Sequence, residues 1–347
     1  MYVCGVTPYD VTHLGHAATY VWVDVLTRFL RHLGCDVEVC RNVTDVDDVL
    51  LDAARRVGAS YDSFAAVQEF HFEQDMAALG IRPPTHAPRA HNFVRPVVSL
   101  AAGLLDAGRA YVRDGSVYFR GADVVERAGL SRDEALALSA EFHDEPDDPR
   151  KDDPFDVAVW RASEPGTPAW PSPWGPGRPG WHAECAAMAM TVFGPALDVH
   201  AGGADLRFPH HAYEAAFAEA LTGVRPFARS WMRIGLVHVG GAKMAKSAGN
   251  LVLVSDVLAK HSPAALRLAI VERRWWESWD FDAASLDDAE ARVQELFAAA
   301  GRPERIGGVQ AVLEALRDDL DVPRALAVAL EDGGSAARLV AEVLGLR

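Results

Sequence analysis

The first 48 residues constrain the fold most strongly, because they alternate between strand and helix patterns. The apolar run MYVCGV at residues 1–6 predicts a buried strand, and the glycine-containing turn THLGH follows at residues 12–16. Apolar residues then recur at helical spacing up to Gly34, which predicts the end of that helix. The alternating segment CDVEVCRNV at residues 35–43 predicts a second strand. Strand, helix and strand in this order indicate a right-handed parallel unit, so we expect an α/β fold built on a Rossmann-like parallel sheet.

The middle of the chain predicts a different local structure. Residues 60–110 have a helical pattern that is broken by the proline-rich segment at 80–88. The segment AYVRDGSVYFR at 110–120 predicts a hairpin, because Asp114-Gly115 is a turn signal between two alternating runs. Residues 144–180 are rich in proline, glycine, aspartate and tryptophan, and we interpret them as a long functional loop across an insertion.

The α/β pattern resumes after this loop. WHAECAAMAMTVFG at 181–194 predicts a helix, LDVHAGG at 197–203 a strand, and the segment after FPHH at 208–211 a further helix. RIGLVHVGG at 233–241 predicts another strand, and helical patterns continue from about residue 256 to the end.

Composition indicates a reduced, soluble protein. The 347 residues include 50% hydrophobic residues, and the net charge of −15 excludes a strong non-specific hold of the whole surface on nucleic acid phosphates. Four cysteines occur without a secretory leader or an apolar run of about 20 residues, so we expect a cytoplasmic protein without a membrane partner.

Four residues are candidates for one metal site. His210 and Glu214 are four apart at a predicted helix start and therefore share a face, where an imidazole and a carboxylate can hold one cation. The thiolates of Cys4 and Cys185 would complete a tetrahedral zinc shell. The alternatives are that each cysteine is a small buried apolar residue and that His210 and Glu214 satisfy the helix N-terminus.

Two further groups of residues suit a polyphosphate. His13 and His16 lie where the first strand turns into the first helix, with Gly15 allowing close approach of a ligand to the backbone. Lys243 and Lys246 lie in the glycine-flanked segment VGGAKMAKSAGN and can follow the charge of a departing pyrophosphate. The alternatives are a metal-binding histidine pair and a solvated basic loop.

Together, HLGH and KMAKS resemble the HIGH and KMSKS signatures of class I aminoacyl-tRNA synthetases. The segments NVTDVDD, RPGWHAEC and FPHH extend the resemblance to cysteinyl-tRNA synthetase across nearly all the catalytic region. The resemblance implies an ATP-dependent enzyme in which a zinc ion binds the thiolate of the cysteine substrate and Mg²⁺ accompanies ATP.

The resemblance also assigns roles to residues. The zinc ligands would be Cys4, Cys185, His210 and Glu214, and the cysteine pocket would contain Thr7, Thr44, Trp181 and Asp205. The catalytic residues would be His13, His16, Lys243 and Lys246, and the ATP site would contain Thr12, His13, Gly15, His16, Lys243, Met244, Lys246 and Ser247. Ala245 stands where KMSKS has serine, but both lysines remain, so we expect activation to survive.

The implied fold is a HUP-type Rossmann-like catalytic domain with an inserted subdomain and a C-terminal helical domain. We expect its two catalytic halves at 1–90 and 178–235, the inserted connective subdomain at 91–177, a KMSKS-loop region at 236–282 and the helical domain at 283–347.

The final segment resembles only the start of an anticodon-binding region. The chain resembles the cysteine:glucosaminyl-inositol ligase family of mycothiol biosynthesis in three features. These are the short final segment, Ala17-Ala18 and the long loop before residue 181. That family implies two half-reactions, formation of cysteinyl-AMP and its transfer to the amine of glucosaminyl-inositol. We therefore expect small-molecule substrates (L-cysteine, ATP and glucosaminyl-inositol), no tRNA partner and a monomer.

Four alternatives to this ligase stay open. Ala212 and Tyr213 depart from both families after FPHH, and Glu214 resembles the fourth ligand of the synthetases rather than the ligases. A cysteinyl-tRNA synthetase with a shortened C-terminus and a cysteine ligase acting on another amine are the enzyme alternatives. Two alternatives are not enzymes. One is a non-catalytic sensor that binds cysteine or an adenylate, and the other is a structural zinc protein.

Overall fold

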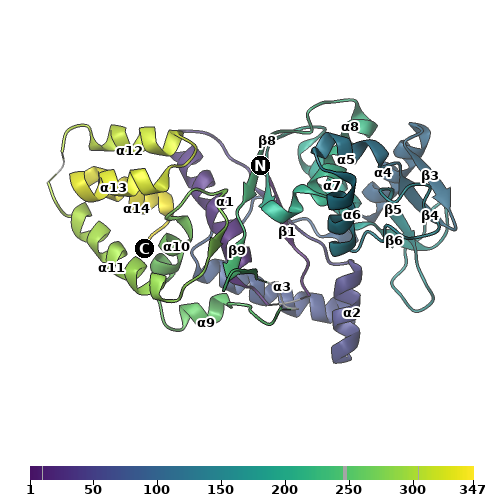
Figure 1. Ribbon diagram of the computed structural model, residues 1–347, viewed down its shortest axis with the longest axis horizontal. Coiled ribbons are helices and arrows are strands. Elements are labelled where there is room, and N and C mark those ends of the chain that lie inside the picture. The colour runs from purple at the N-terminus through teal and green to yellow at the C-terminus, as the bar shows by residue number, and fades with distance from the viewer. Residues whose placement is uncertain (10, 245–247, 304) are drawn as a thin grey trace. The chain divides into compact units, whose positions relative to one another are not determined.

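The computed structural model describes residues 1–9, 11–244, 248–303 and 305–347. The chain forms two compact units (Figure 1). The first unit contains residues 1–10, 38–69 and 84–232, and the second contains 11–37, 70–83 and 233–347.

A parallel sheet carries the first residues of the chain. Its strands are β1 (Tyr2–Val6), β2 (Cys40–Val43), β7 (Leu197–Gly203) and β8 (Ala228–Ile234), in the order β2-β1-β7-β8. β1 runs parallel to β2, with Tyr2 opposite Cys40, and parallel to β7, with Tyr2 opposite His200. β1 is apolar and largely buried, which is typical of a parallel strand covered on both faces. The predicted α/β fold is confirmed, although β2 begins at Cys40 and not at residue 35.

The strand order places a topological switch point between β1 and β7. From β1 the chain adds β2 on one side of the sheet and later returns to add β7 on the other side. Ligands of open α/β sheets bind outside the carboxyl ends of the strands at such a point. The residues that follow β1 and β7 are therefore placed where a substrate pocket is expected.

Helices and an antiparallel sheet complete the first unit. The helices are α2 (Asp48–Val57), the start of α3 (Tyr61–Ala78), η1 (Ala90–Asn92), α4 (Val94–Asp106), α5 (Ala122–Ala128), α6 (Arg132–Glu141), α7 (Trp181–Phe193), η2 (Ala204–Arg207) and α8 (His210–Thr222). α7 packs against both α4 and α8. The antiparallel strands are β3 (Ala110–Arg113), β4 (Ser116–Phe119), β5 (Val157–Ala162) and β6 (Gly177–Pro179), in sequence order.

The hairpin prediction is confirmed, whereas the long-loop prediction is wrong in part. Asp114 and Gly115 both have positive φ, 50° and 78°, as a tight two-residue hairpin turn requires. The segment 144–180, however, contains β5 and β6. Val159 and Trp160 of β5 are fully buried, and β5 pairs with β4 despite its proline- and aspartate-rich flanks.

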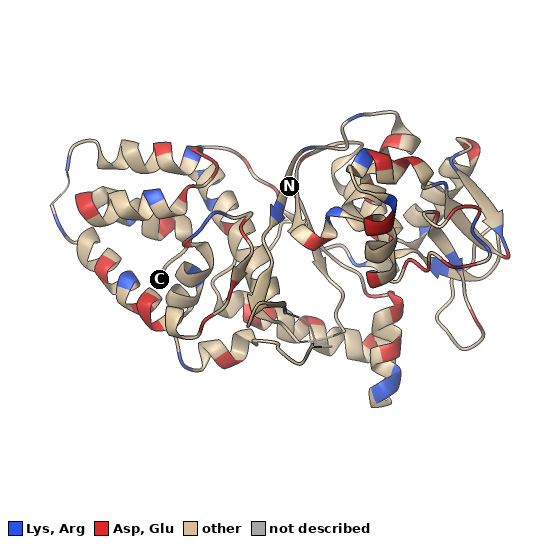
Figure 2. Ribbon diagram, viewed as in Figure 1, with Lys and Arg blue, Asp and Glu red and all other residues tan. Residues whose placement is uncertain are grey.

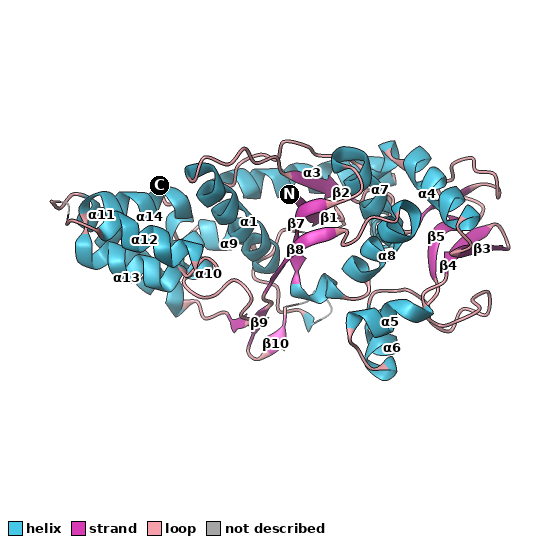
Figure 3. Cartoon of the chain, turned by 90° about the horizontal axis from the view of Figure 1, so that it is seen from above, coloured by secondary structure: helices cyan, strands magenta, loops and turns pink. Residues whose placement is uncertain are grey.

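The second unit is mainly helical. Its helices are α1 (Leu14–His32), the end of α3, α9 (Val254–Leu258), α10 (Pro263–Val271), α11 (Ala284–Ala300), α12 (Gly308–Arg317), α13 (Val322–Asp332) and α14 (Gly334–Leu344). α10 begins at a serine cap, because the Ser262 side chain accepts from the Ala265 amide and Pro263 occupies the first turn. α11, α13 and α14 pack on one another (Figure 3).

A small three-stranded sheet also belongs to the second unit. β9 (Val237–Val239) lies between antiparallel β10 (Ala242–Lys243) and parallel β11 (Trp279–Asp280). The single strand predicted at 233–241 is therefore wrong, since its two halves belong to β8 and β9 in different sheets. The break falls at Gly235, where a Cβ atom would lie 2.1 Å from the carbonyl oxygen of Glu277. Only glycine allows this close approach of two backbone segments.

Candidate functional site

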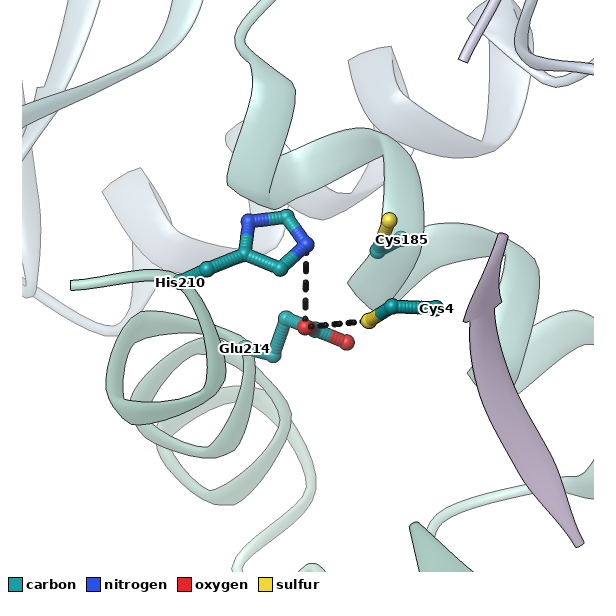
Figure 4. Close-up of side chains that lie close together, drawn as sticks. All are labelled: Cys4, Cys185, His210 and Glu214. Carbon is teal, nitrogen blue, oxygen red and sulfur yellow. Dashed lines mark hydrogen bonds and ion pairs between the residues drawn. The ribbon is translucent and has the colours of Figure 1, made fainter. Parts of the chain in front are cut away.

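Four side chains from β1, α7 and α8 converge in the first unit. Figure 4 shows the side chains of Cys4, His210 and Glu214 meeting, with Cys185 close beside them. Their ligand atoms all lie within 4.8 Å of each other. His210 Nε2 is 3.2 Å from Glu214 Oε1, and Cys4 Sγ is 3.5 Å from the same oxygen. Ligands of a tetrahedral zinc ion lie about 3.3–3.8 Å apart, so the two printed distances are close to this spacing and all four atoms are near enough to share one small cation.

The environment of these four residues also suits a cation. Glu214 and His210 are at most 1% exposed, and both cysteines are buried. Burial, the neighbouring Cys185 and the carboxylate of Glu214 raise the pKa of the Cys4 thiol well above its usual range. Burial lowers the pKa of His210 to about 3, so its imidazole is neutral at pH 7, as a metal ligand must be. Two sulfurs, one imidazole and one carboxylate form a donor set that fits zinc.

Side chains around the four residues hold them in place. Asn42 in β2 donates from Nδ2 to Cys185 Sγ at 3.2 Å, and its Oδ1 accepts from the Gly5 amide at 2.8 Å. His200 Nε2 lies 2.9 Å from Glu214 Oε2, which leaves Oε1 directed at Cys4 and His210. Such outer contacts orient ligands and tune their basicity.

Sequence reasoning missed the histidines near this cluster. His211 Nε2 lies 3.6 Å from Cys4 Sγ, and Cys4, His200, His211 and Glu214 form a second close donor group. This second group shares Cys4 and Glu214 with the first, so it describes one buried centre rather than two. The sequence contains these histidines in the segments HAGG and FPHH. The spacing of the segments does not show which histidine would bind a metal and which would only support a ligand.

An aromatic and histidine layer covers the cluster on the side of α7. The Trp181 ring stacks on His210 with centroids 3.9 Å apart. His182 Nδ1 lies 2.8 Å from His210 Nδ1, and His182 Nε2 lies 3.0 Å from an oxygen of Asp144. The predicted pocket residue Trp181 therefore lies in direct contact with a predicted metal ligand.

The other predicted cysteine-pocket residues follow the carboxyl ends of neighbouring strands. Thr7 follows β1, Thr44 follows β2, and Asp205 lies in η2 directly after β7. The hydroxyl oxygens of Thr7 and Thr44 are 2.6 Å apart. These positions agree with the edge at which the switch point predicts a ligand.

In the second unit, His13 and His16 form a capping box at the start of α1. His13 Nδ1 accepts from the Gly15 amide at 3.2 Å, and His16 Nδ1 accepts from the His13 amide at 3.4 Å. Because both Nδ1 atoms act as acceptors, each neutral ring carries its proton on Nε2. The two rings stack with centroids 3.9 Å apart, and burial lowers the pKa of His16 well below its usual value.

Backbone hydrogen bonds connect the two nucleotide signatures. Leu14 N donates to Val252 O at 2.9 Å and Val254 N to Thr12 O at 3.1 Å, so the segment after the KMAKS sequence pairs with the start of α1. Lys243 ends β10, and Met244 N donates to Val237 O of β9 at 3.2 Å. The described residues before and after 245–247 are thus held by backbone hydrogen bonds. The predicted residues Lys246 and Ser247, and the departure at Ala245, lie outside the described residues.

Comparison with known proteins identifies the catalytic region. The family described as tRNA synthetases class I (C) catalytic domain matches residues 1–291. The chain is 46% identical to an L-cysteine:1D-myo-inositol 2-amino-2-deoxy-α-D-glucopyranoside ligase of Mycolicibacterium vanbaalenii, over 94% of this chain and 79% of that protein. Ligases of the same name from Frankia casuarinae (44% identity, 97% and 76% coverage) and Acidothermus cellulolyticus (45% identity, 94% and 83% coverage) are similarly close.

Solved structures agree on the fold. Methionyl-tRNA synthetase of Mycobacterium tuberculosis in complex with methionyl-adenylate has a TM-score of 0.69 at 19% identity, covering 98% of this chain and 82% of that chain. A putative arginyl-tRNA synthetase of Campylobacter jejuni gives a TM-score of 0.58 at 16% identity, covering 99% and 89%. Within the described residues, none of the helices has the length and apolar character that crossing a membrane demands.

Proposed function

Because the chain belongs to the L-cysteine:1D-myo-inositol 2-amino-2-deoxy-α-D-glucopyranoside ligase family, within the class I synthetases, we propose that it joins L-cysteine to the amine of glucosaminyl-inositol using ATP. The observation that carries the proposal is the convergence of Cys4, Cys185, His210 and Glu214 within 4.8 Å, with Cys4 supplied by β1, a strand that borders the switch point of the sheet. This step of mycothiol biosynthesis requires selection of cysteine, its activation and its transfer.

Selection depends on the donor set in the first unit. A bound zinc ion would supply a soft Lewis acid that binds a thiolate far better than a protonated hydroxyl. An apolar pocket alone distinguishes small groups by only about 1–3 kcal/mol, which would admit serine and alanine too often. Cys4, Cys185, His210 and Glu214 would hold the ion, and Trp181, stacked on His210, would close the side of the pocket.

Activation falls to the residues of the second unit. The cysteine carboxylate attacks the α-phosphate of ATP, the bond from that phosphorus to the pyrophosphate oxygen breaks, and cysteinyl-AMP and pyrophosphate form. The Nε2–H groups of His13 and His16 donate to phosphate oxygens beside the positive end of α1. Lys243 and Lys246 neutralise the departing pyrophosphate, and Mg²⁺ enters with ATP.

Transfer forms an amide. The acceptor amine attacks the carbonyl carbon of cysteinyl-AMP, the carbon–oxygen bond to AMP breaks, and the amine releases one proton. Thr7, Thr44 and Asp205 would orient the amino acid at the carboxyl edge of the sheet. We expect the protein to act as a monomer in the cytoplasm.

The test is acceptor profiling. Purified protein is incubated with ATP, radiolabelled cysteine and either glucosaminyl-inositol or tRNA, with serine replacing cysteine as the control. The proposal predicts a labelled amide with the sugar amine, one AMP per amide, and no labelled tRNA. Labelled tRNA without the amide would overturn it in favour of a synthetase, and failure of cysteine-dependent ATP–pyrophosphate exchange would favour a non-catalytic sensor.

A further inference from the structure

A polar cavity in the first unit has no role in the site described above. It has a volume of about 340 Å³, which is within the range of small-molecule sites. Residues of α2, β4, β5 and β6 and of the segment 145–151 line it. Figure 2 shows acidic and basic residues together in this part of the chain.

Two arginines fix two carboxylates at the wall of this cavity. Arg178 donates from Nε and Nη2 to Asp48 Oδ1 at 2.8 and 2.7 Å. Arg161 Nη1 lies 3.1 Å from Glu145 Oε2 and 3.9 Å from Asp48 Oδ2. The arginine side chains are 14% and 24% exposed, whereas Asp48 is 45% and Glu145 54% exposed. The less exposed guanidinium groups therefore fix the carboxylates in position, while the carboxylates stay accessible to a ligand.

The lining indicates the chemical class of that ligand. Four carboxylates and five cationic side chains almost cancel in charge, so the cavity does not suit a polyphosphate. Leu51, Ala158 and Ala162 are its few aliphatic side chains, so it does not suit an acyl chain. Carboxylates accept hydrogen bonds from hydroxyl and ammonium groups, and guanidinium groups donate to hydroxyl oxygens. The lining therefore suits a hydroxyl-rich molecule that also carries an amine.

The elements that line the cavity also lead to the four predicted metal ligands. Arg178 lies in β6, which leads directly through Gly180 into α7, the helix that carries Cys185. Glu145 follows Asp144, which contacts His182, and His182 in turn contacts His210. Asp48 lies four residues after Thr44. Three walls of the cavity thus extend into elements that hold the predicted cysteine pocket.

We propose that this cavity is the acceptor subsite, in which Asp48 and Glu145, backed by Arg178 and Arg161, bind the hydroxyl groups of an amino sugar. This inference rests on the proposed ligase function, since it names the place where the second substrate binds. The acceptor's hydroxyl groups replace water on the carboxylates.

The experiment separates the two half-reactions in the full-length protein. Glu145→Gln and Asp48→Asn keep the size of each side chain and remove its charge. Loss of a charge-assisted hydrogen bond predicts a rise of roughly 10- to 100-fold in KM for glucosaminyl-inositol. Cysteine-dependent ATP–pyrophosphate exchange, which uses no acceptor, stays within about twofold of the wild type and also reports correct folding. Glu126→Gln on the exposed side of α5 is the matched control and leaves both readouts unchanged.

The outcomes distinguish this inference from the function on which it rests. Raised acceptor KM in both variants with normal exchange supports the subsite. If the wild type forms the amide and both variants keep its KM, the cavity proposal is overturned and the ligase function stands. If the wild type performs exchange but forms no amide with glucosaminyl-inositol, the proposed function fails and the subsite fails with it.

Discussion

Asn42 offers the sharpest test of how the protein supports its predicted metal ligands. Its side chain connects two parallel strands to the cluster, because Oδ1 accepts from the Gly5 amide and Nδ2 donates to Cys185 Sγ. The side chain is only 1% exposed, so water does not replace either contact. Asn42→Ala removes both hydrogen bonds and no ligand.

Two effects of this substitution can be estimated. An unpaired Gly5 amide costs about 1–3 kcal/mol of folding free energy. Loss of a hydrogen bond to a ligating sulfur weakens metal affinity by about 10- to 100-fold, which is the usual effect of removing an outer contact. The zinc dissociation constant should therefore rise by that factor, while metal-free protein is destabilised by about 1–3 kcal/mol.

The assay is competition for zinc against a chromophoric chelator, with denaturant unfolding of the metal-free protein measured in parallel. Asn92→Ala, at an exposed position in η1, is the matched control and leaves zinc affinity unchanged. An Asn42→Ala variant that binds zinc within twofold of the wild type would refute the argument that this contact supports a ligand.

Three other substitutions test separate parts of the account. Cys185→Ala abolishes zinc content and cysteine-dependent ATP–pyrophosphate exchange, and retention of both in metal analysis and exchange assays would refute the ligand assignment. His13→Asn keeps a good helix cap but removes an imidazole donor, so exchange falls roughly 100- to 1,000-fold with unchanged thermal unfolding; near-normal exchange would contradict the phosphate role. Asp24→Asn leaves two buried guanidinium groups, from Arg28 at 2.7 Å and Arg267 at 2.6 Å, without their counter-charge. Denaturant unfolding should show a loss of about 3–5 kcal/mol, whereas exposed Asp36→Asn shows none.

The sequence predicted local structure best at short, unusual motifs that contain candidate functional residues. THLGH at a strand-to-helix turn and FPHH at a helix start marked residues whose backbone setting follows from local rules. α1 and α8 begin within these two segments, at Leu14 and His210. The roles of these residues as ligands and phosphate donors stay predictions.

The sequence was uninformative where long-range pairing decides the structure. β5 is a six-residue run whose flanks have loop composition, and its partner β4 lies about 40 residues earlier. The segment at 233–241 reads as one strand, yet the close approach of Glu277 at Gly235 divides it between two sheets. His182 and His200 have no local pattern that marks them, because their role arises only when α7, β7 and α8 are brought together.

The central claim is that one metal ion, held by two cysteines, recognises the sulfur of the substrate. X-ray absorption at the zinc edge of the loaded protein counts the sulfur atoms around the ion directly. The account predicts two sulfurs, from Cys4 and Cys185, without substrate and three when L-cysteine is added, with no change on adding L-serine. A count that stays at two in saturating cysteine would contradict the claim.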